Sequence, residues 1–497
     1  MTNYRSATGT DVRDKVEQTI RQEIRDGNYI ITSTKPTIVS ALGAVPKQDS
    51  NNIRLIHDCS RPDNGNLNSY ANEAPPFSFV TIDHATSLIK PNAFLAKLDL
   101  KSAYRHVPLH PSNYEATGLA WTFAGDSTPT YLYDCKLPFG SSKSPEIFNR
   151  LTQAVTRIMA RRGHTILAYL DDFLIIADTE QDCRDAYLQL IDLLHELGFN
   201  INWNKAVEPC QNLTFLGIEI NSVLRQLTLP DSKLCEMRSL LSGVLNKRKL
   251  TKRDLQSLAG KLNFAARVIH GGRTFLRRII DAINSTARPH HHIRITQQLR
   301  LDLTWWRDFM YTFNGKAFFV ESEPIPLDEF STDACPSGGG GYFRGDWFYV
   351  NWRTDYPHLQ SAHINLQETF TVLVAIKRWK HALRGKWIIV HTDNMTTLSV
   401  INKGTSRNPQ AMRWLRELFW LSAMFNFRIT ARFISTSANW LADAISRLHC
   451  PTYCEYLRHN MPSNMDLTWG SHLSSNALAS LPFQVQCMLR NRTLIRN

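Results

Sequence analysis

The sequence has no apolar run of about 18 residues, the shortest length typical of a membrane-spanning helix. We therefore expect no membrane-spanning segment. The first residues, MTNYRSATGTDVRDK, are polar, so we also expect no secretory signal peptide. Low-complexity tracts are absent, and aromatic residues make up 10% of the chain, which excludes a wholly disordered protein.

The sequence also lacks a cysteine pattern. Its nine cysteines are odd in number and scattered, which indicates reduced intracellular thiols and not a disulfide framework. One C-terminal group has a spacing that suggests zinc, formed by His449, Cys450, Cys454 and His459. It lacks a fourth, correctly placed ligand for the retroviral zinc knuckle, so free thiols on a tail are the preferred interpretation.

Basic residues, in contrast, are plentiful. The chain of 497 residues carries a formal net charge of +13, and its length indicates three or four domains. Residues 231–300 hold fifteen Lys/Arg and four Asp/Glu, so this segment supplies most of the excess. Such a concentration is typical of a surface that binds phosphates. A solvated basic surface without a ligand is the alternative.

Hydrophobic periodicity predicts the order of the structural elements. Residues 12–30 place Val16, Ile20 and Ile24 on one face of a helix. Between 93 and 220, strands and helices do not alternate regularly, so an antiparallel sheet flanked by helices is favoured over a doubly wound parallel sheet. Residues 231–312 read as almost wholly helical. A proline-containing linker then precedes a compact α/β unit, in which residues 338–341 are expected to form a glycine-rich turn.

Three acidic residues in the first half lie at the ends of apolar strands. Asp99 follows AFLAKL, whereas Asp171 and Asp172 separate TILAYL from FLIIAD and are expected at the tip of a tight hairpin. Burying three carboxylates together is unfavourable unless cations neutralise them. Two Mg²⁺ ions about 3.5–4 Å apart, with Mn²⁺ as an alternative, suit such a set and in-line displacement at phosphorus. An ordinary acidic hairpin turn is the alternative for Asp171-Asp172 alone.

These acids stand within segments that resemble the motifs of reverse transcriptases. The segments are LDLKSAYRHVPLHP at 98–111, LPFGSSKSPEIFNRL at 137–151, YLDD at 169–172, LGFNINWNKA at 197–206 and FLGIEI at 215–220, preceded by LGAVPKQDSNNIRLIHDCSRPDNGNLN at 42–68. The resemblance implies that Asp99, Asp171 and Asp172 bind the metals. It implies nucleotide contacts for Lys47, Arg54, Tyr104, Phe139, Gly140 and Lys205.

Several of these residues have an implied role. Tyr104 would collide with a 2′-hydroxyl and so select deoxynucleotides, although a buried core tyrosine is the alternative. Lys205 would neutralise the leaving pyrophosphate. Phe139 stands where retroviral enzymes carry glutamine and related retrotransposon enzymes carry an apolar residue. Nucleic-acid contacts are implied for Tyr169 and for basic residues of the expected thumb, namely Lys252, Arg253, Lys261, Arg267, Arg273, Arg277 and Arg278.

A second acidic set in the α/β unit resembles the ribonuclease H domain of retroelements. Asp333, Glu368, Asp393 and Asp443 lie within FSTDACPSGGGGYF, INLQETFTVLVAI, VHTDNMTTLSVI and NWLADAISR. The resemblance implies that all four hold two metal ions for hydrolysis of RNA in an RNA–DNA hybrid. Phe433 stands where the family often carries a mobile histidine.

The resemblance implies an α+β multidomain fold. Its parts are an N-terminal helix with fingers (1–92), a palm with part of the fingers (93–228), a helical thumb (229–325), a ribonuclease H-like α/β domain (326–448) and a tail (449–497). The motif wording is most similar to DIRS-type retrotransposons, related to Ty3/gypsy elements of the LTR type. This implies an intracellular enzyme, in the cytoplasm, the nucleus or both.

The expected partners are an RNA template, a DNA primer, RNA–DNA hybrid and dNTPs, with an integrase or recombinase and a capsid protein on other chains. An RNA-dependent RNA polymerase is one alternative, against which Tyr104 and the appended nuclease argue. A decayed or domesticated copy that binds nucleic acid without turnover is the other.

Overall fold

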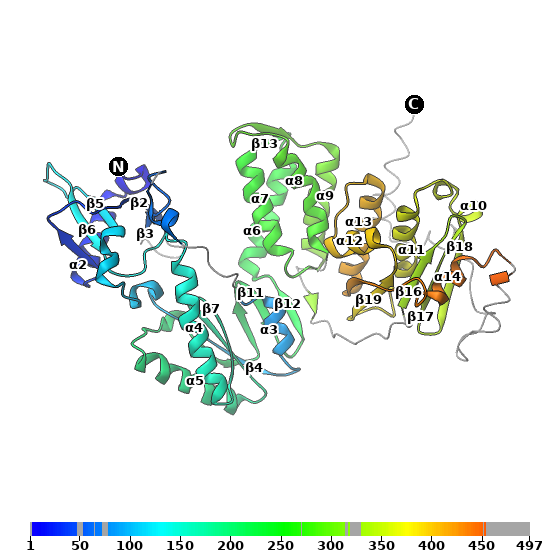
Figure 1. Cartoon of the computed structure of the whole chain (residues 1–497), viewed down its shortest axis with the longest axis horizontal. Coiled ribbons are helices and arrows are strands. Elements are labelled where there is room, and N and C mark those ends of the chain that lie inside the picture. The colour runs from blue at the N-terminus through cyan, green and yellow to red at the C-terminus, as the bar shows by residue number, and fades with distance from the viewer. Residues whose placement is uncertain are drawn as a thin grey trace. The chain divides into compact units, whose positions relative to one another are not determined.

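The computed structural model describes residues 2–46, 53–63, 65–71, 78–269, 271–313, 317–318, 330–450 and 452–453. It divides into two compact units (Figure 1). Unit 1 comprises residues 1–216 and 220–223, and unit 2 comprises residues 217–219 and 224–497. None of the helices in the described ranges is both long and apolar enough to cross a membrane.

Unit 1 begins with a five-stranded N-terminal sheet. Its strands in spatial order are β1 (Tyr29–Thr32), β6 (Thr130–Asp134), β5 (Gly118–Trp121), β2 (Val39–Pro46) and β3 (Ile53–Asp58). The helix α2 (Arg13–Arg25) buries Val16 and Ile20 in the core of this sheet, and Ile24 packs against it, as the helical spacing predicted. The other short helices in this half are α1 (Arg5–Thr8), η1 (Leu67–Tyr70), α3 (Ile82–Leu88), η2 (Ala103–His106) and η3 (Pro111–Ala116).

A second sheet of unit 1, here called the palm sheet, is antiparallel, as predicted. Its strands in order are β7 (Thr165–Tyr169), β8 (Asp172–Ala177), β4 (Phe94–Asp99) and β9 (Val207–Cys210). The helices α4 (Ser144–Arg161) and α5 (Glu180–Glu196) share one core with alternate strand residues such as Leu98, Phe173 and Ile175. Because side chains alternate along a strand, Asp99 and Asp172 lie on the opposite face from these helices. η4 (Trp203–Lys205) precedes β9, and β10 (Asn212–Phe215) and β11 (Ile218–Asn221) follow it.

The first part of unit 2 is mainly helical. It contains α6 (Asp231–Leu245), α7 (Lys252–Ala265), η5 (Gly272–Leu276), α8 (Arg277–Asn284) and α9 (Gln297–Phe313). The prediction of an almost wholly helical segment missed one antiparallel pair, β13 (Lys249–Thr251) with β14 (His292–Arg294). These strands have three residues each, too few for a period-2 pattern to stand out. A further pair joins β12 (Gln226–Thr228) to β15 (Ala317–Phe318).

The C-terminal sheet of unit 2 is mixed. Its order is β18 (Asp346–Asn351), β17 (Gly338–Phe343), β16 (Phe330–Ala334), β19 (Trp387–Thr392) and β20 (Arg428–Phe433), with β19 parallel to both neighbours. The helices of this part are α10 (Trp352–Asp355), η6 (Pro357–Leu359), α11 (Ile364–Trp379), α12 (Met395–Lys403), α13 (Pro409–Phe425) and α14 (Trp440–Ser446).

The predicted glycine-rich turn at 338–341 is wrong, because these residues open strand β17. The glycines are needed for packing. A Cβ atom on Gly340 would lie 2.6 Å from the backbone nitrogen of Ser446, and one on Gly338 would lie 2.8 Å from the Ser446 carbonyl oxygen. Helix α14 therefore approaches the sheet more closely than any side chain on the strand would allow.

The palm core gives a stability prediction. Phe173 is fully buried between the palm sheet and its helices, so Phe173→Ala should lower the free energy of unfolding of unit 1 by about 3–5 kcal/mol. Pulse proteolysis across a urea series, followed on unit 1 fragments, measures this. Leu188→Ala, at a side chain that is 52% exposed on α5, is the control and should stay within about 0.5 kcal/mol of the parent. Equal losses in both variants would contradict the assigned core.

Candidate active sites

The three acids of the palm sheet lie at the β7–β8 hairpin and the end of β4. Asp99, the last residue of β4, pairs in register with Asp172, the first residue of β8. The hairpin turn consists of Leu170 and Asp171, so the prediction that Asp171 and Asp172 together form the tip is wrong by one position. The backbone carbonyl of Asp171 accepts a hydrogen bond from the amide of Leu100 at 3.0 Å, which ties the turn to β4.

The turn stores backbone strain beside the acids. Leu170 has a φ of 53°, in the left-handed region that costs an L-residue roughly 1–2 kcal/mol. Strained conformations of this kind persist when the surrounding structure determines them, and they concentrate at functional sites.

Cationic and amide side chains hold two of the acids. Lys205 Nζ lies 3.2 Å from Asp99 Oδ2, and Asn202 Nδ2 donates to Asp99 Oδ1 at 2.9 Å. Lys97 Nζ lies 3.1 Å from Asp172 Oδ1. Sequence reasoning missed Asn202 and Lys97. For Lys97 a signal existed, since it stands two residues before Asp99 in the same strand and therefore shares its face.

Burial shifts the proton equilibria of this site. It raises the pKa of Asp172 to about 6, against the lowering effect of Lys97 and with a further rise from Asp99. Burial also raises the pKa of Asp171, to which the negative charge of Asp99 adds. The site therefore favours added positive charge, whether protons or cations.

Four of the residues implied in nucleotide binding lie together, namely Phe139 and its neighbours Arg54, Tyr104 and Gly140. The rings of Tyr104 and Phe139 are 4.9 Å apart, and the guanidinium of Arg54 lies 5.6 Å from the Phe139 ring centroid. Gly140 follows with a φ of +141°, where a Cβ atom would lie 1.8 Å from the carbonyl oxygen of His57. Lys205 lies instead at Asp99, and Lys47 falls outside the described residues.

The residues implied in nucleic-acid binding have varied surroundings. The Tyr169 ring lies 5.1 Å from that of Phe79. In unit 2, Arg253, Arg267 and Arg273 are exposed. The others have protein partners: Lys252 bonds the carbonyls of Thr286 and Ala287, Lys261 pairs with Glu236, and Arg277 pairs with Asp281.

The expectation that Arg278 follows a phosphate backbone needs correction. Its Nη1 lies 2.6 Å from Oδ1 of Asp302, a carboxylate that is buried and that Arg416 of α13 also contacts. Burying Asp302 without a cation would be costly, so Arg278, whose side chain is 17% exposed, is held by this carboxylate.

Three acids converge in the C-terminal sheet. Asp333 lies on β16, Glu368 on α11 and Asp393 directly after β19, and one ligand oxygen from each lies within 4.8 Å of the others. The fourth predicted acid, Asp443, does not join this group. Its Oδ1 lies 2.6 Å from Arg447 Nη2, one helical turn away, while its negative charge acts on Asp333, so metal binding by all four acids stays a prediction.

Hydrogen bonds orient these three carboxylates. Ser446 Oγ donates to Asp333 Oδ2 at 2.8 Å, and Thr436 Oγ1 donates to Asp393 Oδ2 at 2.8 Å. The amide of Ala334 donates to Glu368 Oε1 at 3.2 Å. Burial, together with the negative charges of Asp443 and Asp393, raises the pKa of Asp333 to about 7. Burial and the charge of Asp333 raise the pKa of Glu368.

The donor set fits divalent metal ions. Carboxylate oxygens are the ligands that Mg²⁺ prefers, and the buried pair Asp333 and Glu368, whose pKa values are raised, would be stabilised in the ionised form by cations. Phe433, at the expected histidine position, ends β20 opposite Thr392 and is 55% exposed.

Comparison with known proteins agrees with the palm geometry. Residues 45–220 match the family described as reverse transcriptase (RNA-dependent DNA polymerase). Protein P of duck hepatitis B virus (isolate Shanghai/DHBVQCA34) is 25% identical over 248 residues, which cover 49% of this chain and 29% of that protein. The Gag-Pol polyprotein of avian reticuloendotheliosis virus is 32% identical over 148 residues, covering 29% of this chain and 13% of that protein. The chain thus spans less than a third of these relatives.

Solved structures extend the likeness in fold. The foamy viral protease-reverse transcriptase in complex with RNA/DNA hybrid has a TM-score of 0.55 at 17% identity and covers 88% of this chain and 55% of its own. The same protein in complex with dsDNA gives 0.54 at 17% identity, covering 88% and 85%. The predicted fold class, a polymerase followed by a further α/β domain, is confirmed. The chain therefore carries a reverse transcriptase domain over residues 45–220, with homologues among retroviral and hepadnaviral polymerases.

Proposed function

We propose that the chain is a reverse transcriptase that extends a DNA primer on an RNA template by two-metal nucleotidyl transfer. The observation that carries this proposal is the register pairing of Asp99 with Asp172, with Asp171 in the adjoining turn. The foamy viral structures bound to dsDNA and to RNA/DNA hybrid support the choice of nucleic-acid substrates.

Each residue of the palm site has a part in this function. Asp99, Asp171 and Asp172 would hold two Mg²⁺ ions, which when bound lower the barrier to in-line displacement at phosphorus. Lys205, exposed and adjacent to Asp99, is placed to neutralise charge on the leaving pyrophosphate. Tyr104 presents its ring beside Phe139, where it would exclude a 2′-hydroxyl. Lys97 balances the charge of Asp172 before metals bind.

A second activity, ribonuclease H, is proposed for the C-terminal sheet. The convergence of Asp333, Glu368 and Asp393 within 4.8 Å favours it. When metal ions are bound there, they would activate water against an RNA phosphodiester. Asp443 would join as a ligand through its second carboxylate oxygen or by exchanging the contact of Oδ1 with Arg447. The wording of the motifs favours a retrotransposon origin of the DIRS type, which remains our proposal.

If the two activities use separate sites, a substitution in one site should remove only one activity. Asp171→Asn should lower primer extension by roughly 100-fold or more, since a metal ligand contributes several kcal/mol at the transition state, and should spare RNA cleavage. Asp393→Asn should have the opposite effect. One reaction with an end-labelled RNA template, a differently labelled DNA primer, Mg²⁺ and dNTPs reports both activities. Loss of both activities in either folded variant would contradict two sites.

This reaction also separates the alternatives. Extension with rNTPs but not dNTPs would favour an RNA polymerase. Salt-sensitive hybrid binding without extension or cleavage would favour a decayed copy that binds nucleic acid.

The acids of the C-terminal sheet predict a pH-dependent stability without metals. The folded-state pKa values of Asp333 and Glu368 are raised, to about 7 for Asp333, above unfolded values of about 3.9 for Asp and about 4.3 for Glu. The folded protein therefore keeps protons that the unfolded chain releases, and stability falls as pH rises from about 4 through about 7. In chelator, the Tm of unit 2 should be lower at pH 8 than at pH 5.

Asp333→Asn tests the cause of this dependence. At pH 8 in chelator it should raise Tm by about 2–4 °C, the shift that 1 kcal/mol produces in a domain of about 150–250 residues. Added Mg²⁺ should stabilise the parent and not the variant. The control is Asp281→Asn, at an exposed ion pair that should leave Tm unchanged. A variant less stable than the parent at pH 8 in chelator would contradict the prediction.

A further inference from the structure

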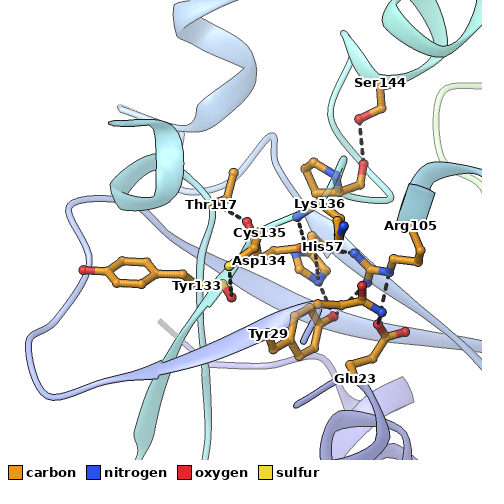
Figure 2. Close-up of polar contacts among 12 residues, drawn as sticks. Glu23, Tyr29, His57, Arg105, Thr117, Tyr133, Asp134, Cys135, Lys136 and Ser144 are labelled. Atoms are coloured by element: carbon orange, nitrogen blue, oxygen red, sulfur yellow. Dashed lines mark hydrogen bonds and ion pairs between the residues drawn. The ribbon is translucent and has the colours of Figure 1, made fainter. Parts of the chain in front are cut away.

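A buried polar network in unit 1 is centred on Arg105 (Figure 2). Arg105 follows Tyr104 in η2, and its Nη1 donates to both carboxylate oxygens of Asp134, at 2.8 and 2.9 Å. Its Nη2 donates to the Tyr29 hydroxyl at 3.2 Å, and its Nε lies 3.2 Å from Glu23 Oε2. The Tyr29 hydroxyl also contacts Nε2 of His57 at 2.9 Å.

The network is built from parts of unit 1 that are far apart in sequence. Glu23 comes from α2, Tyr29 from β1, His57 from β3 and Asp134 from the end of β6, while Arg105 belongs to the segment after β4. The guanidinium thus joins the N-terminal sheet to the strand that ends in Asp99.

Burial makes this network expensive to disrupt. The side chains of Arg105, His57 and Asp134 are 9%, 2% and 0% exposed. Burial lowers the pKa of His57 to about 3, so its ring is neutral and Arg105 is the cation that Asp134 faces. A buried ion pair contributes little net stability against a hydrophobic replacement, which favours a role in fixing geometry.

The network reaches the Phe139–Gly140 turn through the backbone of His57. The His57 amide donates to the Phe139 carbonyl at 2.8 Å, and the His57 carbonyl occupies the space that a Cβ of Gly140 would need. The Arg105 guanidinium itself lies 5.7 Å from the centroid of the Phe139 ring, within cation–π range. The Phe139 ring therefore lies between this guanidinium and the Tyr104 ring, and Tyr104 directly precedes Arg105 in the chain.

We propose that Arg105 is a positioning residue for the sugar of the incoming deoxynucleotide, acting through Tyr104 and Phe139. The inference rests on the proposed polymerase function and deepens it. Arg105 touches no substrate in this arrangement. It holds the two rings in the relative position that decides whether a 2′-hydroxyl fits.

The test separates positioning from simple support of the fold. A residue needed only for stability lowers the amount of active enzyme and leaves the KM for dNTP and the preference for dNTP over rNTP unchanged. A positioning residue changes both, because a displacement of about 1 Å in a site can cost on the order of 100-fold.

The variants are Arg105→Lys and Tyr29→Phe in the full chain. Lysine keeps the charge but cannot form the paired bonds to Asp134 and the bond to Tyr29 together. Tyr29→Phe removes only the hydroxyl that joins Arg105 to His57, and it serves if the first variant does not fold. Arg184→Lys is the matched control, because Arg184 forms an exposed ion pair with Glu180 on α5.

Steady-state primer extension should show a KM for dNTP raised by about 5-fold or more in Arg105→Lys, with kcat changed by less than about 2-fold. Discrimination against rNTP should fall by about 5-fold or more, since it depends on the same ring positions. Tyr29→Phe should shift both in the same direction by less, and Arg184→Lys should match the parent. Unchanged KM and discrimination in the folded variants of an active parent would overturn this inference alone. A folded parent that extends no primer would overturn the proposed function and this inference with it.

Discussion

Carboxylates of one charge, brought close together by the fold, are the constraint on which both candidate sites depend. Each loses hydration and faces a neighbour that repels it, so the surrounding chain must supply positive charge or hold a proton. In the palm sheet the chain supplies lysines. Lys205 and Lys97 stand beside Asp99 and Asp172, on the face that the helices leave uncovered. The ammonium groups of Lys205 and Lys97 therefore lie beside the carboxylates that are expected to bind divalent ions.

The C-terminal sheet meets the same constraint differently. The guanidinium of Arg447 is paired with Asp443, and the hydroxyl groups of Ser446 and Thr436 donate to Asp333 and Asp393. Asp333 keeps its proton to a pH near neutrality, as its pKa of about 7 indicates, and burial raises the pKa of Glu368 as well. Such a site costs stability in the absence of metal, which is a common feature of sites selected for activity. The two sites thus differ in how far protein cations neutralise their carboxylates in advance.

Much of the fold could be predicted from local sequence patterns. The helix at 12–30, the hairpin that contains YLDD and the placement of acids at strand ends all follow from periodicity and neighbouring residues. What failed depends on contacts between distant segments. Arg278 is predicted at the surface because the sequence does not reveal that Asp302 lies beside it. The glycines at 338–341 are predicted to form a turn because the sequence does not reveal that α14, about 100 residues later, packs on them. Asn202 was overlooked for the same reason, since its amide meets Asp99 across 103 positions.

In the Arg105 network, a buried charge is used to fix the positions of neighbouring side chains. Asp134 is buried like the site acids, yet it has a permanent guanidinium partner in bidentate contact, so its charge is satisfied without metal. That difference separates an acid used to fix structure from acids left available for ligands. Asp134 bonds Arg105, which directly follows Tyr104 in the chain. Arg105 also bonds Tyr29, Tyr29 contacts His57, and the His57 amide donates to the Phe139 carbonyl. Under the proposed function Tyr104 excludes a single oxygen atom, and a side chain with that task needs neighbours held by packing and hydrogen bonds. The cost of burying a carboxylate therefore has two outcomes in this chain. Carboxylates available to ligands lie where chemistry is expected, and the Asp134–Arg105 ion pair lies where side-chain positions must be held.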